Sequence, residues 1–321
     1  MARFRRILYL ERRARGSARA YYCAVHTALV HGASLTLAGV EGRRRLGRMA
    51  ERADTLGLPV RLRDVDLRAA GGGGSDGIPA DVARAHDLVI TVARGKGSRW
   101  WSGADGVARA LVRECTCPTW LLHPLQSAGV RVVVAAIDVS EPAAEVVARK
   151  VVRTAADLAA ESGAELVVLH CWSVMGESMI ASRSRGGGPA RAERILAAAE
   201  RSRHRRVERL LEDVGIPSST TVVLQKGDVV GCIEEVVWRT EADVVVVGSA
   251  ARAGLSGLLV GNTAERLVGR VPASVLVVPG DRRPGGAAGT GVPEGVEVPE
   301  SAGSTVHRPG DRGRDGPGGP L

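Results

Sequence analysis

The chain has 321 residues, of which 45% are hydrophobic and only 3% aromatic, and its formal net charge is +9. This length suggests two domains of ordinary size, and the apolar fraction is that of a globular protein with a core of aliphatic side chains. No apolar run approaches the roughly 18–20 residues that a membrane-spanning helix needs, so a membrane segment is excluded and we expect a cytoplasmic protein.

The cysteines and the basic residues predict little chemistry of their own. The basic stretch from Arg183 to Arg206 holds no aromatic residue on which a nucleic-acid base could stack, so it favours a solvated basic face over nucleic-acid binding. The cysteines share no repeated spacing, and we expect reduced thiols and no metal site. They are Cys23, Cys115, Cys117, Cys171 and Cys232.

Two stretches that lie 156 residues apart resemble each other. "HDLVITVARGKGSRWWSGADGVARALV" (His86–Val112) aligns with "ADVVVVGSAARAGLSGLLVGNTAERLV" (Ala242–Val268), and Asp87 falls on Asp243. Internal repetition of this kind predicts a duplicated architecture. We therefore predict two domains, 1–125 and 130–279, and a Gly- and Pro-rich tail, 280–321, that is too poor in apolar residues to fold.

In the first copy, the glycine-rich "GGGGSDGIP" (Gly71–Pro79) disfavours a helix where the second copy predicts one. The second copy alternates strands and helices along its whole length. The first predicted helix is capped by Ser140, has Pro142 in its first turn and stops near Gly163. Further helices are predicted at 190–214, 230–240 and 263–269. Strands are predicted at Val130–Asp138, Ala164–Val174, Ser219–Gly227, Asp243–Val247 and Ser274–Val278.

This alternation predicts an α/β fold with two tandem five-stranded, mostly parallel sheets of Rossmann-like topology, flanked by helices. Asp138 ends the first strand of the second copy, Gly248 ends the fourth, and Gly261 precedes the next helix. Such positions meet at the carboxyl edge where the winding of the sheet reverses. Glycine admits a phosphate to the backbone, a helix N-terminus attracts it, and the aspartate can accept a hydrogen bond from ribose or adenine.

The second copy resembles the universal stress protein family. The resemblance lies in the strand that ends at Asp138, in "KGDVVGCIEEVVWRTEADVVVVGS", and in "GLSGLLVGNTAERLV" followed by "VPASVLVVP". It covers Val130–Pro279 well and Arg3–Pro124 weakly. The resemblance therefore implies a tandem, two-domain member of the family whose first domain is degenerate.

The resemblance also implies a nucleotide site. The ATP-binding branch of the family carries Gly-x2-Gly-x9-Gly-Ser/Thr, and this chain keeps the spacing but has alanine at the second glycine and asparagine at the serine. The residues alone leave open whether the loop binds ATP or is only a structural turn. If it binds, ATP with magnesium is the implied cofactor. The implied binding residues are Asp138, Gly248, Ala251, Gly261, Asn262 and Thr263.

The first copy lacks these features. Val92 and Asp105 stand where the second copy has Gly248 and Gly261, and Glu11 or Arg12 stands where it has Asp138. A carboxylate at a phosphate position repels the ligand, so we expect the first domain to serve as a packing partner.

No catalytic residue is predicted, and we expect a regulatory or binding protein. His170-Cys171 is interpreted as structural or ligand-lining, and Trp100-Trp101 as a hydrophobic plug or a domain contact. The alternatives are a scaffold without nucleotide, a slow ATPase and a nucleic-acid-associated protein. The resemblance further implies that Ala273–Val278 pairs with Thr119–His123 across an internal pseudo-twofold axis. A homodimer or another protein partner is left open.

Overall fold

The computed structural model describes residues 4–12, 14–39, 43–64, 84–93, 106–125, 129–173, 189–249 and 262–280. Residues Met1–Arg282 form one compact unit. The predicted tail lies outside the described residues from position 281 onward, as do Trp100 and Trp101. The first half contains strands β1 (Arg6–Glu11), β2 (Ser34–Gly39), β3 (Val60–Asp64), β4 (Leu88–Val92) and β5 (Thr119–Leu122), with helices α1 (Ser17–His31), α2 (Arg43–Asp54) and α4 (Gly106–Glu114).

The second half follows the predicted alternation of strands and helices closely. Its strands are β6 (Val132–Ile137), β7 (Glu165–Trp172), β8 (Thr221–Lys226), β9 (Val244–Ser249) and β10 (Ser274–Pro279). Its helices are α5 (Pro142–Ser162), α7 (Pro189–Val214), α8 (Val229–Thr240) and α9 (Asn262–Leu267).

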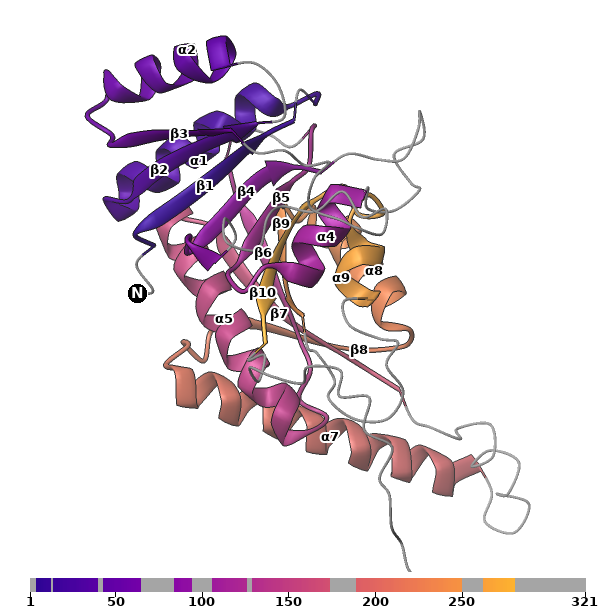
Figure 1. Cartoon of the computed structure of the whole chain (residues 1–321). Coiled ribbons are helices and arrows are strands. Elements are labelled where there is room, and N and C mark those ends of the chain that lie inside the picture. Colours follow the sequence, from indigo (N-terminus) through magenta and orange to yellow (C-terminus); the bar gives the residue numbers. More distant parts are fainter. Residues whose placement is uncertain are drawn as a thin grey trace, which may run out of the picture. The chain divides into compact units, whose positions relative to one another are not determined.

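All ten strands belong to one sheet, in the order β3-β2-β1-β4-β5-β10-β9-β6-β7-β8 (Figure 1). Neighbouring strands within each half are parallel, and β5 and β10 are antiparallel, with Trp120 opposite Leu276. The predicted pairing of these two strands is confirmed. The two predicted sheets are therefore the two halves of one continuous sheet.

Helices cover both faces of the sheet (Figure 1). α1, α2, α5 and α7 contribute to the core on one face, and α4, α8 and α9 to the core on the other. Successive strand residues alternate between the two cores, as Ile7 and Leu8 do. Strands buried on both faces need apolar residues at successive positions, which explains the valine runs of this sequence.

The boundaries of α5 follow from three residues. Pro142 occupies the first turn, and Gly163 ends the helix in the left-handed conformation at φ 64°, as predicted. The expectation for Ser140 was wrong, because the N-cap position is Glu141, whose side chain makes no capping hydrogen bond. Proline fits the first helical position, so the helix begins at Pro142 and Ser140 lies one residue too early to cap it.

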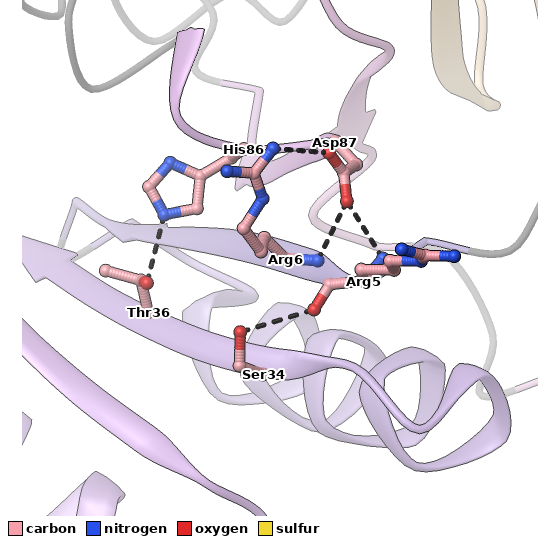
Figure 2. Close-up of polar contacts among 6 residues, drawn as sticks. All are labelled: Arg5, Arg6, Ser34, Thr36, His86 and Asp87. Carbon is pink, nitrogen blue, oxygen red and sulfur yellow. Dashed lines mark hydrogen bonds and ion pairs between the residues drawn. The ribbon is translucent and has the colours of Figure 1, made fainter.

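A single aspartate joins the first and fourth strands of the first half (Figure 2). Asp87 Oδ2 accepts hydrogen bonds from the backbone N–H groups of Arg5 (2.9 Å) and Arg6 (3.0 Å), and the Arg6 guanidinium lies 3.2 Å from Oδ1. Burial raises the pKa of Asp87, but these hydrogen bonds outweigh it and the pKa is lowered overall. Beside this contact, the Ser34 hydroxyl donates to the Arg5 carbonyl.

The second half repeats the arrangement. Asp243 Oδ2 accepts from the N–H groups of Arg131 (2.7 Å) and Val132 (3.2 Å) at the start of β6. The aspartate that aligned the two copies in the sequence therefore has a structural role in both, since it satisfies amide groups that the sheet leaves without partners.

We expect Asp243→Ala to lower the free energy of unfolding by about 2–3 kcal/mol and Asp87→Ala by about 1 kcal/mol. The Asp243 side chain is only 8% exposed, so water cannot replace it, whereas that of Asp87 is 32% exposed. Urea unfolding at pH 7 measures both values. Equal losses of unfolding free energy in the two variants, or a larger loss in Asp87→Ala, would contradict the structural role.

Candidate functional site

The carboxyl edge of the second half contains a reversal of winding between β6 and β9, which is where a ligand crevice is expected in this class of fold. β6 and β9 are neighbours in the sheet, while the chain leaves β6 toward β7 on one side and leaves β9 toward β10 on the other. In doubly wound sheets, ligands bind at this reversal of winding. The register pairs Ala136 with Val247, so Asp138 and Gly248 lie at the same edge of adjacent strands.

Asp138 is held in place by its own loop. Its side chain is half-buried, and Oδ1 accepts a hydrogen bond of 2.8 Å from the Ser140 N–H. Helix α7 supports the same loop, because Arg206 Nη1 donates to the carbonyls of Val139 and Ser140, both at 3.1 Å. The carboxylate is therefore fixed beside the crevice before any ligand arrives.

His170 lies next to Asp138, at the end of β7. Its Nδ1 is 3.0 Å from the Ile137 carbonyl, which can only accept, so Nδ1 carries the hydrogen. Burial lowers the pKa of His170, and Arg203 and Arg206 lower it further, against the opposing effects of this hydrogen bond and of Asp138. The ring is therefore neutral, and Nε2 is a buried acceptor without a hydrogen-bond partner in the part of the chain that the structure describes.

The neighbouring thiol does not form a nucleophilic pair with this histidine. Adjacent strand residues point to opposite faces, so Cys171 faces α8 while His170 faces α5 and α7. Burial, with Cys232 close by, raises the pKa of Cys171 well above its usual value, and a protonated thiol is a poor nucleophile. The interpretation of His170 as structural or ligand-lining stays consistent with the geometry.

Gly248 has a packing role that the sequence did not reveal. A Cβ at this position would lie 2.5 Å from Val147 Cγ1 and 3.5 Å from Val151 Cγ2, both on α5. This close approach of helix to strand requires glycine whether or not a phosphate binds. Gly248 alone is therefore weak support for a nucleotide site, and Asp138 is the stronger part of it.

The other predicted binding residues are placed only in part. Ala251 and Gly261 lie outside the described residues, and for Asn262 the structure gives the backbone alone, at the start of α9. Thr263 is half-buried on this six-residue helix. The described chain thus brings Asp138 and Gly248 together and leaves the rest of the phosphate loop as a prediction.

In the first half, an arginine occupies the position of Asp138. The pairing of Leu10 with Thr91 matches that of Ala136 with Val247, which puts Arg12 where the second half has Asp138. Arg12 is 9% exposed, and its Nη1 donates to the Val92 carbonyl at 3.4 Å. The sequence had left Glu11 and Arg12 as alternatives for this place.

A buried polar cluster fills the core beside Arg12, and it was not predicted from the sequence. The Tyr9 hydroxyl donates to Glu11 Oε2 at 2.9 Å and is 2.8 Å from the Ser17 carbonyl. Arg45 of α2 lies 3.6 Å from the same Glu11 oxygen. Burial and the Glu11 carboxylate raise the pKa of Tyr9, which stays protonated. The alternating tyrosine and glutamate of β1 were the only sequence signal of this cluster.

Other kinds of site find little support in the described ranges. These ranges hold no group of three or more His, Cys, Asp and Glu residues that could bind a metal ion, and none of their helices is both long and apolar enough to cross a membrane. No disulfide joins any of the five cysteines.

The fold and its winding reversal are those of a doubly wound α/β protein with Rossmann-like topology. The model of the universal stress protein family matches residues 129–279, the segment that contains β6–β10. This half of the chain belongs to the universal stress protein family.

One curated relative is also a universal stress protein, and two solved structures share the fold. Universal stress protein Rv2623 of Mycobacterium tuberculosis H37Rv is 29% identical over 210 residues, which span 62% of this chain and 64% of that relative. A functionally unknown protein from Pseudomonas aeruginosa PAO1 has the same fold, with a TM-score of 0.65 and 20% identity over 87% of this chain and 93% of its own. A universal stress protein from Archaeoglobus fulgidus superposes with a TM-score of 0.52 and 14% identity, over 85% of this chain and 98% of its own.

We expect Gly248→Ala to lower the free energy of unfolding by about 1–3 kcal/mol, because the new methyl group overlaps Val147. The cost should shrink in the background of Val147→Ala, which removes the overlapping methyl groups. Gly47→Ala is the control, since its Cβ would have no neighbour within 4 Å and helix α2 favours alanine. Additive costs for positions 248 and 147 in a double-mutant cycle would refute the packing role.

Acid should destabilise the protein through His170. In the unfolded chain the histidine takes up a proton as the pH falls through about 6.5, while the folded protein resists it until a lower pH. Relative to His170→Gln, the wild type should lose stability below pH 6.5 at up to about 1.4 kcal/mol per pH unit, until the folded form also binds the proton. Urea unfolding of both proteins between pH 5 and 7.5 measures the difference, and parallel curves would show that His170 titrates normally.

Proposed function

We propose that the chain is a tandem universal stress protein with domains 1–125 and 130–279, which binds an adenine nucleotide in the second domain only and acts as a regulatory binding protein. The observation that carries this proposal is the contrast between the two winding reversals. One has the half-buried carboxylate of Asp138 at its edge, and the other has the buried guanidinium of Arg12 against the Val92 carbonyl.

The described residues suit the ribose end of a nucleotide. A carboxylate accepts hydrogen bonds from vicinal hydroxyl groups, and Asp138 is held by its loop at the winding reversal where such a ligand would lie. The predicted phosphate loop supplies Ala251, Gly261, Asn262 and Thr263 in the spacing of the ATP-binding branch. Magnesium bound with ATP would neutralise charge on its phosphates.

Binding without rapid turnover fits the site best. A general base must reach the attacking water, and among the described residues of the crevice the candidates are Asp138 and His170. Asp138 Oδ1 accepts from Ser140, and His170 is buried below the edge with its Nδ1 committed to Ile137. His170 therefore does not reach solvent, and the proposal assigns Asp138 to the ribose, away from the phosphates at which hydrolysis takes place.

The pairing of the halves also bears on partners. β5 and β10 are already paired within the chain, so these strands have no free edge for a second molecule. A homodimer, or a complex with another protein, would therefore use a surface other than this junction.

Calorimetric titration with MgATP at low ionic strength tests the proposal. We expect heat from the wild type and a 10- to 100-fold loss of affinity in Asp138→Ala, because charged hydrogen bonds to the ribose are removed. Gly261→Asp, which copies Asp105 of the first half, should abolish binding.

Glu141→Ala is the matched control, since it removes an exposed carboxylate three positions beyond Asp138 whose side chain makes no capping hydrogen bond. Glu141→Ala should bind MgATP with the affinity of the wild type. If the wild type gives no heat, the nucleotide site is rejected and the chain is a scaffold. If Asp138→Ala binds normally, the nucleotide lies elsewhere.

A further inference from the structure

Arg206 connects helix α7 to the loop that carries Asp138. The helix is anchored on the core by Val207, Leu210 and Leu211, all nearly fully buried, so the backbone of Arg206 is fixed beside the sheet. From there its guanidinium reaches the β6–α5 loop, where Nη1 lies 3.1 Å from the carbonyl oxygens of both Val139 and Ser140.

A single peptide group links Arg206 to Asp138. The carbonyl of Val139 and the N–H of Ser140 belong to the same planar unit, whose two ends point in opposite directions. Arg206 binds the oxygen end, and the N–H end donates to Asp138 Oδ1 at 2.8 Å. Holding the oxygen therefore fixes the direction of the N–H and, with it, the carboxylate.

We propose that Arg206 is a positioning residue of the candidate nucleotide site, which acts by holding the Val139–Ser140 peptide so that Asp138 faces the crevice. The role in nucleotide binding rests on the proposed function, whereas the effect on the loop does not. Hydrogen bonds from an ionised donor are stronger than those from a neutral one. The loop should therefore become more mobile when the guanidinium of Arg206 is removed, because only the loop's own hydrogen bonds then hold it.

The second arginine that faces this edge of β7 has a different task. Arg203 lies over the ring of Trp172, 4.9 Å from its centroid, and its Nη1 donates to the Ala199 carbonyl within α7. The contacts of its guanidinium are with β7 and its own helix, whereas Arg206 reaches the Asp138 loop. Arg205, the residue before Arg206, is exposed as Arg206 is, but the structure gives its side chain no contact with the loop, which makes it the matched control.

Hydrogen exchange tests the positioning role without any nucleotide. We expect Arg206→Ala to raise the exchange rate of the Ser140 amide about tenfold. Arg206→Lys, which keeps a charged donor, should restore part of the protection, and Arg205→Ala should match the wild type. The amides of β9 report global stability and should be unchanged. Equal Ser140 exchange in the wild type and Arg206→Ala overturns the proposal.

Calorimetry with MgATP then tests the consequence. Arg206→Ala should weaken binding about tenfold, and it should add little in the background of Asp138→Ala, since both changes act through one carboxylate. An undiminished effect of Arg206→Ala in that background would show that Arg206 acts on the ligand directly, against a positioning role. If the wild type does not bind ATP, the proposed function fails, and the exchange experiment still decides whether Arg206 holds the loop.

Discussion

The antiparallel contact between β5 and β10 is the constraint on which the rest of the structure depends. β5 has only four residues, and three of them pair with β10. Two other contacts reinforce the junction: the His123 N–H donates to the Ser274 hydroxyl at 2.9 Å, and Arg113 of α4 forms two hydrogen bonds with Glu265 of α9, at 2.7 and 3.0 Å. Without this pairing, each half would present an open edge and a helix layer with an uncovered side.

The direction of this pairing also separates the two winding reversals. Within each half all strands are parallel, and β5 runs against β10, so the carboxyl ends of the two halves lie at opposite edges of the sheet. The edge that carries Arg12 therefore does not face the edge that carries Asp138. The proposed site of the second half therefore does not depend on the residues at the winding reversal of the first, because neither half contributes strand ends to the other's carboxyl edge.

Local patterns predicted most of the fold. Valine runs, Pro142 and Gly163 identified the elements of the second half, since each reports a property of its own segment. The repeat and the family resemblance predicted the pairing of the last strands. The sequence did not predict three side-chain contacts that form only in the folded chain. They are the packing of Gly248 against Val147, the buried Tyr9–Glu11 contact, and the support of the Asp138 loop by an arginine 66 residues beyond Ser140. No pattern within a segment encodes such contacts.

The case of Gly248 limits what a glycine motif can say about ligands. The spacing of Gly248, Ala251 and Gly261 predicts a phosphate loop, yet the close packing of α5 against β9 requires the first of these glycines. A motif can persist through packing alone after the ligand has been lost. Asp138 also has a local structural contact, because its Oδ1 accepts the Ser140 N–H, so the difference between Asp138 and Arg12 at equivalent positions of the two halves is the more informative observation.

Joining the two halves through β5 and β10 leaves β3 and β8 as the outermost strands of the described sheet. The two strands differ in the side chains that they present at these edges. β3 exposes Arg61 and Arg63 on either side of the exposed Leu62, and charged side chains on an edge strand oppose the addition of another strand. β8 instead presents Val222, Val223 and Leu224, each half-buried, between polar ends. Under conditions that loosen the protein, β8 is the edge at which aggregation by strand addition would begin.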